Sequence, residues 1–201
     1  MDELQFQRIQ QMYNHLWQNG YGDANWKRLA NIVIERNKGG DNSLIDFGFG
    51  TAKAMRFFRN NGFYVEGVEI SSYAIQLANQ NGFRVYHVSV DNLESTFKGT
   101  FGIGFCNDVL EHLPEESVPR AIKEMAKVCH SKLYISVCPT ISHNKSLDGK
   151  NLHLTVKPEE WWTQQLLRVG EVEKLRFMFS RSLRYEVRLN KRNSELVHYF
   201  T

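Results

Sequence analysis

Hydrophobic residues recur along the chain in two patterns, one typical of helices and one typical of buried strands. Near the start, apolar positions three and four residues apart predict amphipathic helices over residues 2–19 and 23–38. After a Gly-Gly break, short continuous apolar runs begin. They predict strands at residues 44–47, 63–69, 83–88, 101–107 and 133–138. Continuous apolar strands are typical of a parallel sheet that is buried on both faces.

Helical patterns separate most of these strands and follow the last of them. They cover residues 51–61, 71–81, a stretch that starts near 114–119, and 158–169. A polar loop over residues 139–157 precedes the last helix. Two alternating strands, 172–179 and 183–189, with a three-residue linker between them, predict an antiparallel hairpin. The pattern therefore predicts an α/β fold. It would be a Rossmann-like, open, mostly parallel seven-stranded sheet with an antiparallel C-terminal hairpin, helices on both faces and two N-terminal helices.

Composition narrows the class of protein. The chain has 201 residues, of which 42% are hydrophobic and 12% aromatic, so we expect one domain with a full core. A net charge of +3 does not by itself favour nucleic acid. No apolar run approaches the roughly 20 residues of a membrane helix, and the acidic start is unlike a signal peptide. The three cysteines, Cys106, Cys129 and Cys138, lack a pairing motif. We therefore expect reduced thiols and a cytoplasmic location.

A glycine turn follows the first predicted strand. Asp46, Gly48 and Gly50 stand at its end, and Glu69 ends the second strand. This layout is typical of nucleotide binding in open α/β sheets. A dinucleotide site would have a small residue at Lys53, and a phosphate loop would end in Gly-Lys-Ser or Gly-Lys-Thr. A carboxylate at Asp46 would repel a pyrophosphate, and it suits a ligand with ammonium and sulfonium charges.

Three stretches in this order, residues 46–52, 67–71 and 105–114, resemble the class I S-adenosylmethionine-dependent methyltransferases. The resemblance implies S-adenosyl-L-methionine as cofactor and S-adenosyl-L-homocysteine as product. It also implies a helical cap over residues 1–40 and a methyltransferase domain, one folding unit, over 41–201. Ala52 stands where the family usually has a third glycine, and we expect so small a side chain to do little harm.

The resemblance also assigns cofactor-binding roles. The two glycines would lie under the methionine part, Asp46 and the backbone carbonyl of Asn107 would face its ammonium, and Glu69 would bind the ribose hydroxyls. Ser89 and the N–H of Val90 would meet the adenine edge, with Asp91 as the alternative, although the family usually has an acid at Ser89. The complete expected set is Asp46, Gly48, Gly50, Thr51, Glu69, Ile70, Ser89, Val90, Asn107, Asp108 and Val109.

His112 and His153 are the expected catalytic residues. An imidazole can act as a base near neutral pH, and in the family a histidine from the loop after the fifth strand often points into the site. A structural histidine that caps the next helix is an equal alternative for His112. Asp108, Glu111, His112 and His153 could also hold a metal, since the small-RNA 3′-terminal 2′-O-methyltransferases have a comparable cluster. We expect no metal, because the Glu-His pair also occurs in metal-free members.

The expected reaction is in-line methyl transfer to an O or N acceptor, most simply a small molecule. Residues 111–114 resemble the quinone-pathway O-methyltransferases, and the motif for transfer to DNA base amines is absent. One alternative is a nucleic-acid 2′-O-methyltransferase that uses the basic hairpin Lys174, Arg176, Arg181, Arg184, Arg188, Lys191 and Arg192. We favour a solvated sheet face for that hairpin. A non-catalytic domain that binds S-adenosylmethionine is a third possibility. Tyr13, Trp17 and Trp26 are expected in the core.

Overall fold

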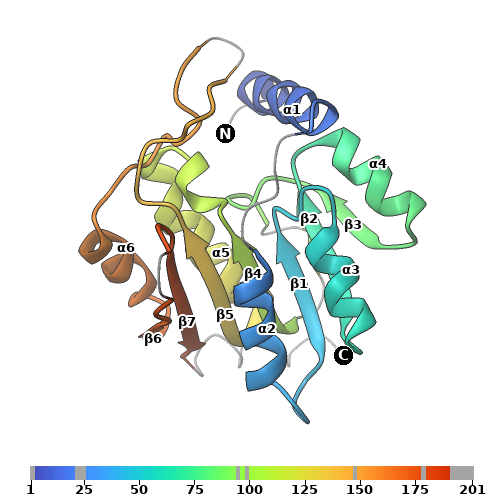
Figure 1. Ribbon diagram of the computed structural model, residues 1–201, viewed down its shortest axis with the longest axis vertical. Helices are drawn as coiled ribbons and strands as arrows, with labels where there is room; N and C mark the ends of the chain where they lie inside the picture. The colour runs from blue at the N-terminus through green and yellow to red at the C-terminus, as the bar shows by residue number, and fades with distance from the viewer. Residues whose placement is uncertain are drawn as a thin grey trace.

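A twisted β-sheet forms the middle layer of the molecule, and helices cover both of its faces (Figure 1). The computed structural model describes residues 3–20, 26–93, 96–97, 100–146, 149–177 and 180–190. Residues 23–25, where the second helix was expected to begin, lie outside these ranges, as do Lys191 and Arg192. Among the described residues, no helix has the length and apolar character that crossing a bilayer requires.

The strands of the described chain form one seven-stranded sheet in the order β3-β2-β1-β4-β5-β7-β6. Their bounds are β1 Ser43–Phe47, β2 Tyr64–Glu69, β3 Arg84–His87, β4 Phe101–Asn107, β5 Cys129–Val137, β6 Gly170–Lys174 and β7 Leu183–Leu189. The first five strands pair in parallel, and β7 pairs antiparallel with both β5 and β6. The predicted fold class is therefore confirmed.

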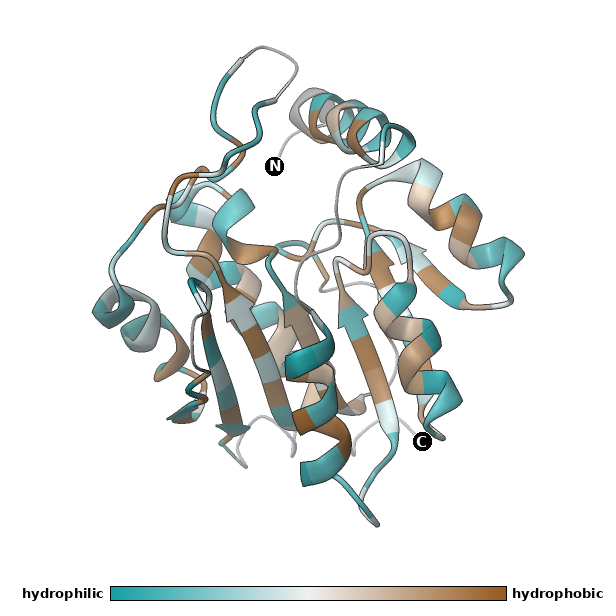
Figure 2. Ribbon diagram, in the orientation of Figure 1, coloured by the Kyte–Doolittle hydropathy of each residue, from teal (hydrophilic) through white to brown (hydrophobic). Residues whose placement is uncertain are grey.

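Two buried clusters attach the helices to the sheet. The helices are α1 Glu3–Gln18, α2 Trp26–Arg36, α3 Lys53–Asn60, α4 Ser72–Gln80, α5 Val118–Val128 and α6 Glu159–Leu166. Buried residues of α2, α3 and α4 share one cluster, and those of α5 and α6 share the other. Figure 2 shows the hydrophobic residues along the central strands and the hydrophilic ones on the outward sides of the helices. Burial of these apolar faces is the main stabilising contribution.

α1 lies over the carboxyl edge of the sheet and is tied to α4. The side chain of Asn14 accepts hydrogen bonds from the Ser71 hydroxyl (2.7 Å) and the Tyr73 N–H (3.1 Å), and it donates to the Ser72 hydroxyl (2.9 Å). Ser71 caps α4 by accepting from the Ala74 N–H. α2 differs from α1, because its buried residues belong to the core cluster.

The tight C-terminal hairpin expected from the sequence is wrong in detail. β6 ends at Lys174, and β7 begins at Leu183, so the connection is longer than the three residues expected. The apolar residues read as a continuing strand pack elsewhere. Leu175 is buried in the cluster of α2 and α3, and Phe177 packs against it. Tertiary burial, rather than strand pairing, explains this apolar pattern.

The predicted solvated face of the hairpin is wrong for two of its charged residues, whereas Lys174, Arg176, Arg181 and Arg188 are exposed as predicted. Arg184 is 2% exposed and Glu186 1% exposed. Arg36 of α2 donates to Glu186 (2.8 Å) and to Glu173 (2.8 Å), and so covers this face of β7. The charges on the hairpin are therefore largely paired within the fold. β5 likewise begins earlier than expected, at Cys129, because α5 passes directly into it.

Ala52 precedes α3 in a left-handed conformation, with φ at 58°. A left-handed backbone costs a residue with a Cβ roughly 1–2 kcal/mol, so alanine is not harmless here. Ala52→Gly should relieve this strain, lose about 0.8 kcal/mol of methyl burial and gain unfolded-state entropy. We expect the free energy of unfolding to change by less than about 0.5 kcal/mol in urea titrations.

Ala126→Gly is the matched control, because Ala126 is as buried as Ala52 but lies within α5. There the substitution removes a methyl group and a good helix former, and should cost about 1.5–2 kcal/mol. Equal losses in the two variants would show that the backbone at Ala52 is unstrained.

Candidate functional site

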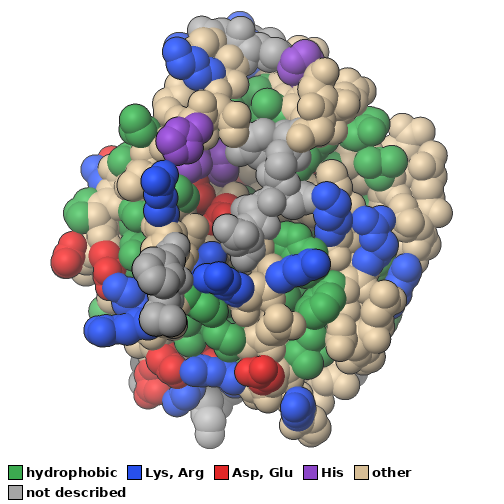
Figure 3. Space-filling view, viewed as in Figure 1, with side chains coloured by type: hydrophobic (Ala, Val, Ile, Leu, Met, Phe, Trp, Pro, Cys, Tyr) green, Lys and Arg blue, Asp and Glu red, His purple; other side chains and the backbone are tan. Residues whose placement is uncertain are grey.

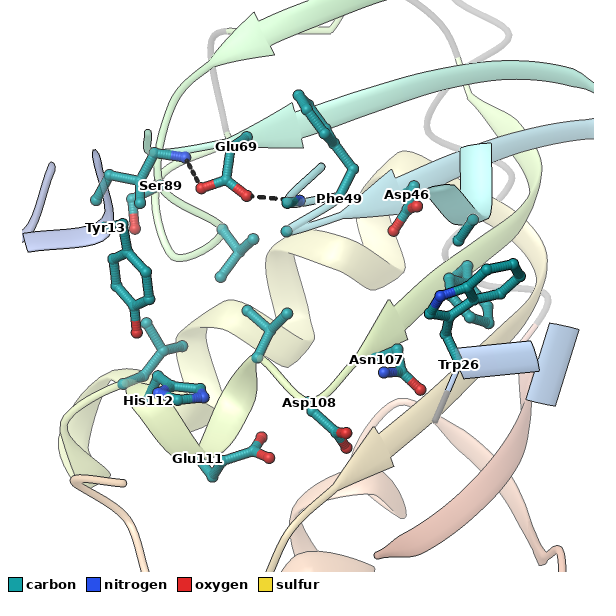
Figure 4. A pocket seen from close by; sticks show the side chains of 18 of the residues that line it. Tyr13, Trp26, Asp46, Phe49, Glu69, Ser89, Asn107, Asp108, Glu111 and His112 are labelled. Carbon is teal, nitrogen blue, oxygen red and sulfur yellow. Dashed lines mark hydrogen bonds between the residues drawn. The ribbon is translucent and has the colours of Figure 1, made fainter. Parts of the chain in front are cut away.

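A cavity of about 360 Å³ opens at the carboxyl ends of β1 to β4, beneath α1. Figure 3 shows histidine and acidic side chains gathered in a hollow between α1 and the sheet. Figure 4 shows Glu69 on one side of this cavity and Glu111 and His112 on the opposite side. Open α/β sheets bind ligands at this edge.

The turn after β1 brings backbone close to other side chains. Gly48 has φ at 77° and Gly50 at 54°, and the Gly48 N–H donates to the Val68 carbonyl at 2.7 Å. A Cβ on Gly48 would meet Val109 at 2.5 Å, and one on Gly50 would meet Trp17 at 2.7 Å. Both glycines are therefore required by conformation and by space.

The buried carboxylate of Glu69 fixes this turn. It accepts hydrogen bonds from the backbone N–H groups of Gly50 (2.9 Å), Ile70 (2.8 Å) and Ser71 (3.0 Å). Burial raises the pKa of Glu69, and these three hydrogen bonds partly offset the rise. A carboxylate has about four acceptor sites, so one site remains for a ligand hydroxyl.

Asp46 lies at the end of β1 with no compensation for its burial. Its side chain is 2% exposed, and Oδ2 has no hydrogen-bond partner among the described residues. Burial raises the pKa of Asp46 well above its usual value, and the charge of Glu69 adds to the rise. A buried carboxyl in this state favours a cationic ligand.

Ser89 and Val90 follow β3 and line the cavity, but Asp91 does not. The Ser89 hydroxyl donates to the Asp91 carboxylate at 2.5 Å. Asp91, the alternative considered for the adenine edge, therefore supports Ser89 from behind.

The turn after β4 is held by β5. Asp108 has φ at 54°, donates its N–H to the Ser136 carbonyl (2.9 Å) and accepts from the Ser136 hydroxyl (2.7 Å). Burial raises the pKa of Asp108, although the hydrogen bond from Ser136 opposes the rise. The side-chain oxygen of Asn107 is buried and unpartnered within the described chain. A strained acid and an unpartnered amide oxygen at one strand end are typical of a functional site.

Glu111, His112 and His153 meet at the far side of the cavity. Their ligating atoms lie within 4.8 Å of one another. Burial and, to a smaller extent, the charge of nearby His153 lower the pKa of His112 to about 3. Burial also disfavours protonation of His153, but hydrogen bonds with Cys138 and the Thr140 carbonyl outweigh it and raise its pKa. The same pairing with His153 lowers the pKa of the Cys138 thiol to about 7.

The structure brings the predicted site residues together. All of them line the cavity except Thr51. Tyr13, Trp17 and Trp26, expected in the core, also line it, and the two tryptophans still pack against core residues. Helical spacing alone could not separate these roles. Sequence reasoning missed Lys53, Cys138 and Ser182 as lining residues. The position of Cys138 at the end of a strand was the available signal.

Comparison with known proteins agrees with this geometry. A family model described as "Methyltransferase domain" matches residues 45–135, from β1 to β5. A search of curated proteins finds no match.

Several solved structures share the fold. Magnesium protoporphyrin IX methyltransferase from Synechocystis PCC 6803, with bound SAH, has a TM-score of 0.67 and 16% identity, over 92% of this chain and 99% of that chain. 1,6-Didemethyltoxoflavin-N1-methyltransferase from Burkholderia thailandensis has a TM-score of 0.70 and 14% identity, over 94% of this chain and 91% of that chain. An amino pentose methyltransferase from Micromonospora echinaspora, with bound SAM, has a TM-score of 0.67 and 16% identity, over 85% of this chain and 94% of that chain. Residues 45–135 therefore match a methyltransferase domain, and the sheet of this chain has the fold of these solved methyltransferases.

Proposed function

We propose that the protein transfers the methyl group of S-adenosylmethionine to an oxygen or nitrogen atom of a small-molecule acceptor. The main support is the buried, unpartnered carboxyl of Asp46 beside the turn of Gly48 and Gly50. Asp46 suits the ammonium group of this cofactor. The two glycines leave backbone exposed where a Cβ would fill the space. The residues present therefore fit the cofactor.

The chain's own residues divide the binding task. When bound, S-adenosylmethionine supplies an electrophilic methyl group on a sulfonium sulfur. Asp46 and the unpartnered oxygen of Asn107, at the ends of two neighbouring strands, accept hydrogen bonds from the ammonium. Glu69 has one acceptor site left, so it binds one ribose hydroxyl rather than both. Ser89 and Val90 border the adenine.

The opposite side of the cavity positions the acceptor. His112 donates its Nδ1–H to the Leu152 carbonyl at 3.0 Å, so its Nε2 is free to accept a hydrogen bond from an O–H or N–H group. Tyr13 of α1 lies edge-on to this ring, with centroids 6.0 Å apart. Alignment of acceptor and methyl group supplies much of the rate of such a displacement.

The cover over the cavity favours a small acceptor. The cavity volume of about 360 Å³ lies in the range of small-molecule sites. The hairpin considered for nucleic acid offers less basic surface than its sequence suggests, because Arg184 is buried and Lys174 and Arg188 pair with acidic residues. The named structural neighbours act on a porphyrin, a toxoflavin precursor and an amino pentose.

Two further expectations remain proposals. We propose that the cap expected over residues 1–40 works mainly through α1, which covers the cavity, and that residues 41–201 form the methyltransferase domain. We also propose a cytoplasmic location, because all three cysteines are free and two of them are buried.

The proposal is tested first by calorimetry with S-adenosylhomocysteine and then by turnover of S-adenosylmethionine with a panel of acceptors. We expect one binding site per chain and transfer to small hydroxyl or amine compounds. No binding at ~1 mM ligand would contradict the cofactor assignment. Turnover with oligonucleotides alone would contradict the acceptor class.

Asp46→Asn should make the ligand-free protein more stable than the wild type, by a margin that grows as pH rises. It should also weaken the binding of S-adenosylhomocysteine. Because the pKa of Asp46 is higher in the folded protein than in the unfolded chain, the folded state holds more protons. Stability therefore falls as pH rises from the ordinary carboxyl pKa toward the raised one. The stability advantage of Asp46→Asn over the wild type should therefore grow by up to about 1.4 kcal/mol per pH unit. Affinity should fall roughly 10–100-fold through loss of a charged hydrogen bond.

Urea titrations from pH 5 to 8 measure the first effect and calorimetry the second. Asp41→Asn is the control. Burial opposes ionisation of Asp41, but hydrogen bonds from Ser43 outweigh it and lower its pKa, so this variant should gain nothing as pH rises. Unchanged binding in Asp46→Asn would remove Asp46 from the site.

Gly48→Ala should lower the affinity for S-adenosylhomocysteine by more than about 10-fold, because the new Cβ fills the space beside Val109 at the glycine turn. Gly82→Ala is matched to it. Gly82 has a similar positive φ of 71°, but no described atom lies within 4 Å of its added Cβ. Both variants should lose about 1–2 kcal/mol of stability through backbone strain, and Gly48→Ala should lose more because its Cβ also overlaps Val109. Calorimetry with S-adenosylhomocysteine should show weaker binding for Gly48→Ala than for Gly82→Ala. Equal affinities would argue against a role of the turn at Gly48 in cofactor binding.

A further inference from the structure

We propose that Glu111, His112 and His153 form a binding site for one divalent transition-metal ion on the acceptor side of the cavity. The sequence-based expectation was that no metal binds. The side chains nevertheless come together from two separate segments, with ligating atoms within 4.8 Å of one another. All three also line the cavity.

Glu111 provides an independent indication of a missing ligand. Its side chain is 0% exposed. One carboxylate oxygen, Oε1, accepts from the Cys138 N–H at 2.8 Å, and the other, Oε2, has no hydrogen-bond partner in the described part of the chain. A buried carboxylate without a partner is costly, and buried charges are normally paired or bound to a metal.

Both histidines are oriented by a hydrogen bond at Nδ1. Nδ1 of His112 lies 3.0 Å from the Leu152 carbonyl, and Nδ1 of His153 lies 2.5 Å from the Thr140 carbonyl. A carbonyl only accepts, so each Nδ1 carries the hydrogen and each Nε2 keeps its lone pair. Histidines that bind metals in proteins are oriented by this kind of hydrogen bond.

The fold assembles the cluster before any ligand arrives. Glu111 and His112 lie in the 3₁₀ turn Leu110–His112 after β4, and His153 lies in the long loop after β5. Thr155 joins the two segments, because its N–H donates to the Glu111 carbonyl (3.0 Å) and its hydroxyl to the Leu113 carbonyl (2.7 Å). The imidazole rings meet edge to face, with centroids 4.9 Å apart.

The donor set indicates the class of ion. Two imidazoles and one carboxylate suit Zn²⁺, Co²⁺ or Mn²⁺ better than Ca²⁺ or Mg²⁺. Bonds of about 2.0–2.2 Å would require side-chain shifts of about 1 Å from the present spacing. Three protein ligands leave a coordination position toward the cavity, as in catalytic rather than structural sites. If the proposed function holds, an oxygen atom of the acceptor would bind there, and the metal would then take the place of His112 Nε2 as the partner of that oxygen.

The test uses the full chain after treatment with chelator and desalting. Calorimetry with ZnCl₂ and the visible spectrum after addition of CoCl₂ should each give one site per chain, and MgCl₂ and CaCl₂ should bind far more weakly. Glu111→Gln keeps the side-chain shape, and His153→Asn alters a half-buried position. Each should reduce Zn²⁺ affinity by about 10–100-fold or more.

His143→Ala is the matched control, because His143 is in the same loop as His153 and pairs with Arg181 outside the cluster. Wild-type affinity in this variant would support the proposal. No Zn²⁺ binding, or equal binding in all variants, would overturn it. Binding of S-adenosylhomocysteine without metal, measured on each variant, reports folding and tests the cofactor site separately. Loss of Zn²⁺ binding with the cofactor site intact therefore assigns the effect to the cluster.

Discussion

The carboxylate of Glu69 joins the two turns on which the cavity is built. It belongs to the end of β2, yet one of its oxygens accepts from the N–H of Gly50 in the turn after β1. Its other oxygen accepts from Ile70 and Ser71, where α4 begins. α1 is tied to that same helix start through Asn14. The position of the cap over the cavity therefore depends on one buried carboxylate.

Burial has the same effect on all four carboxyl groups around the cavity. It is the largest cause of the raised pKa in Asp46, Glu69, Asp108 and Glu111. Arg184 is a buried cation that interacts with Asp108, and its own pKa is lowered by burial. The folded protein therefore holds acceptor groups that it does not itself neutralise. A cationic ligand or ion would relieve this cost, and ground-state instability of this kind is common at functional sites.

The sequence was sufficient where local chemistry and tertiary structure agree. The run that ends in Asp46, the glycine pair and the acid at Glu69 each have a local reason, and the structure brings them to one edge of the sheet. Prediction failed where a distant element decides the outcome. The burial of Arg184 and Glu186 depends on α2, which begins more than 140 residues earlier in the chain. The residue pattern of β7 alone does not show that α2 covers this face of the strand.

The same limit explains the aromatic residues and the long loop. A stripe at helical spacing shows that Trp17 is on the apolar side of α1, but it does not show that this side faces a glycine turn rather than core. Likewise, the polar composition of residues 139–157 predicts a loop without predicting where it docks. Thr155 fixes the position of the loop through two hydrogen bonds to the turn after β4.

The turn after β4 connects the two halves of the site. Asn107 ends the strand on the cofactor side, and Glu111 and His112 follow within five residues on the acceptor side. Asp108, between them, is held in a left-handed conformation by Ser136 of β5. Because one short segment bears groups of both kinds, a shift of its backbone would move them together. The relative placement of methyl donor and acceptor is therefore set by the pairing of β4 with β5, which lies in the interior of the sheet.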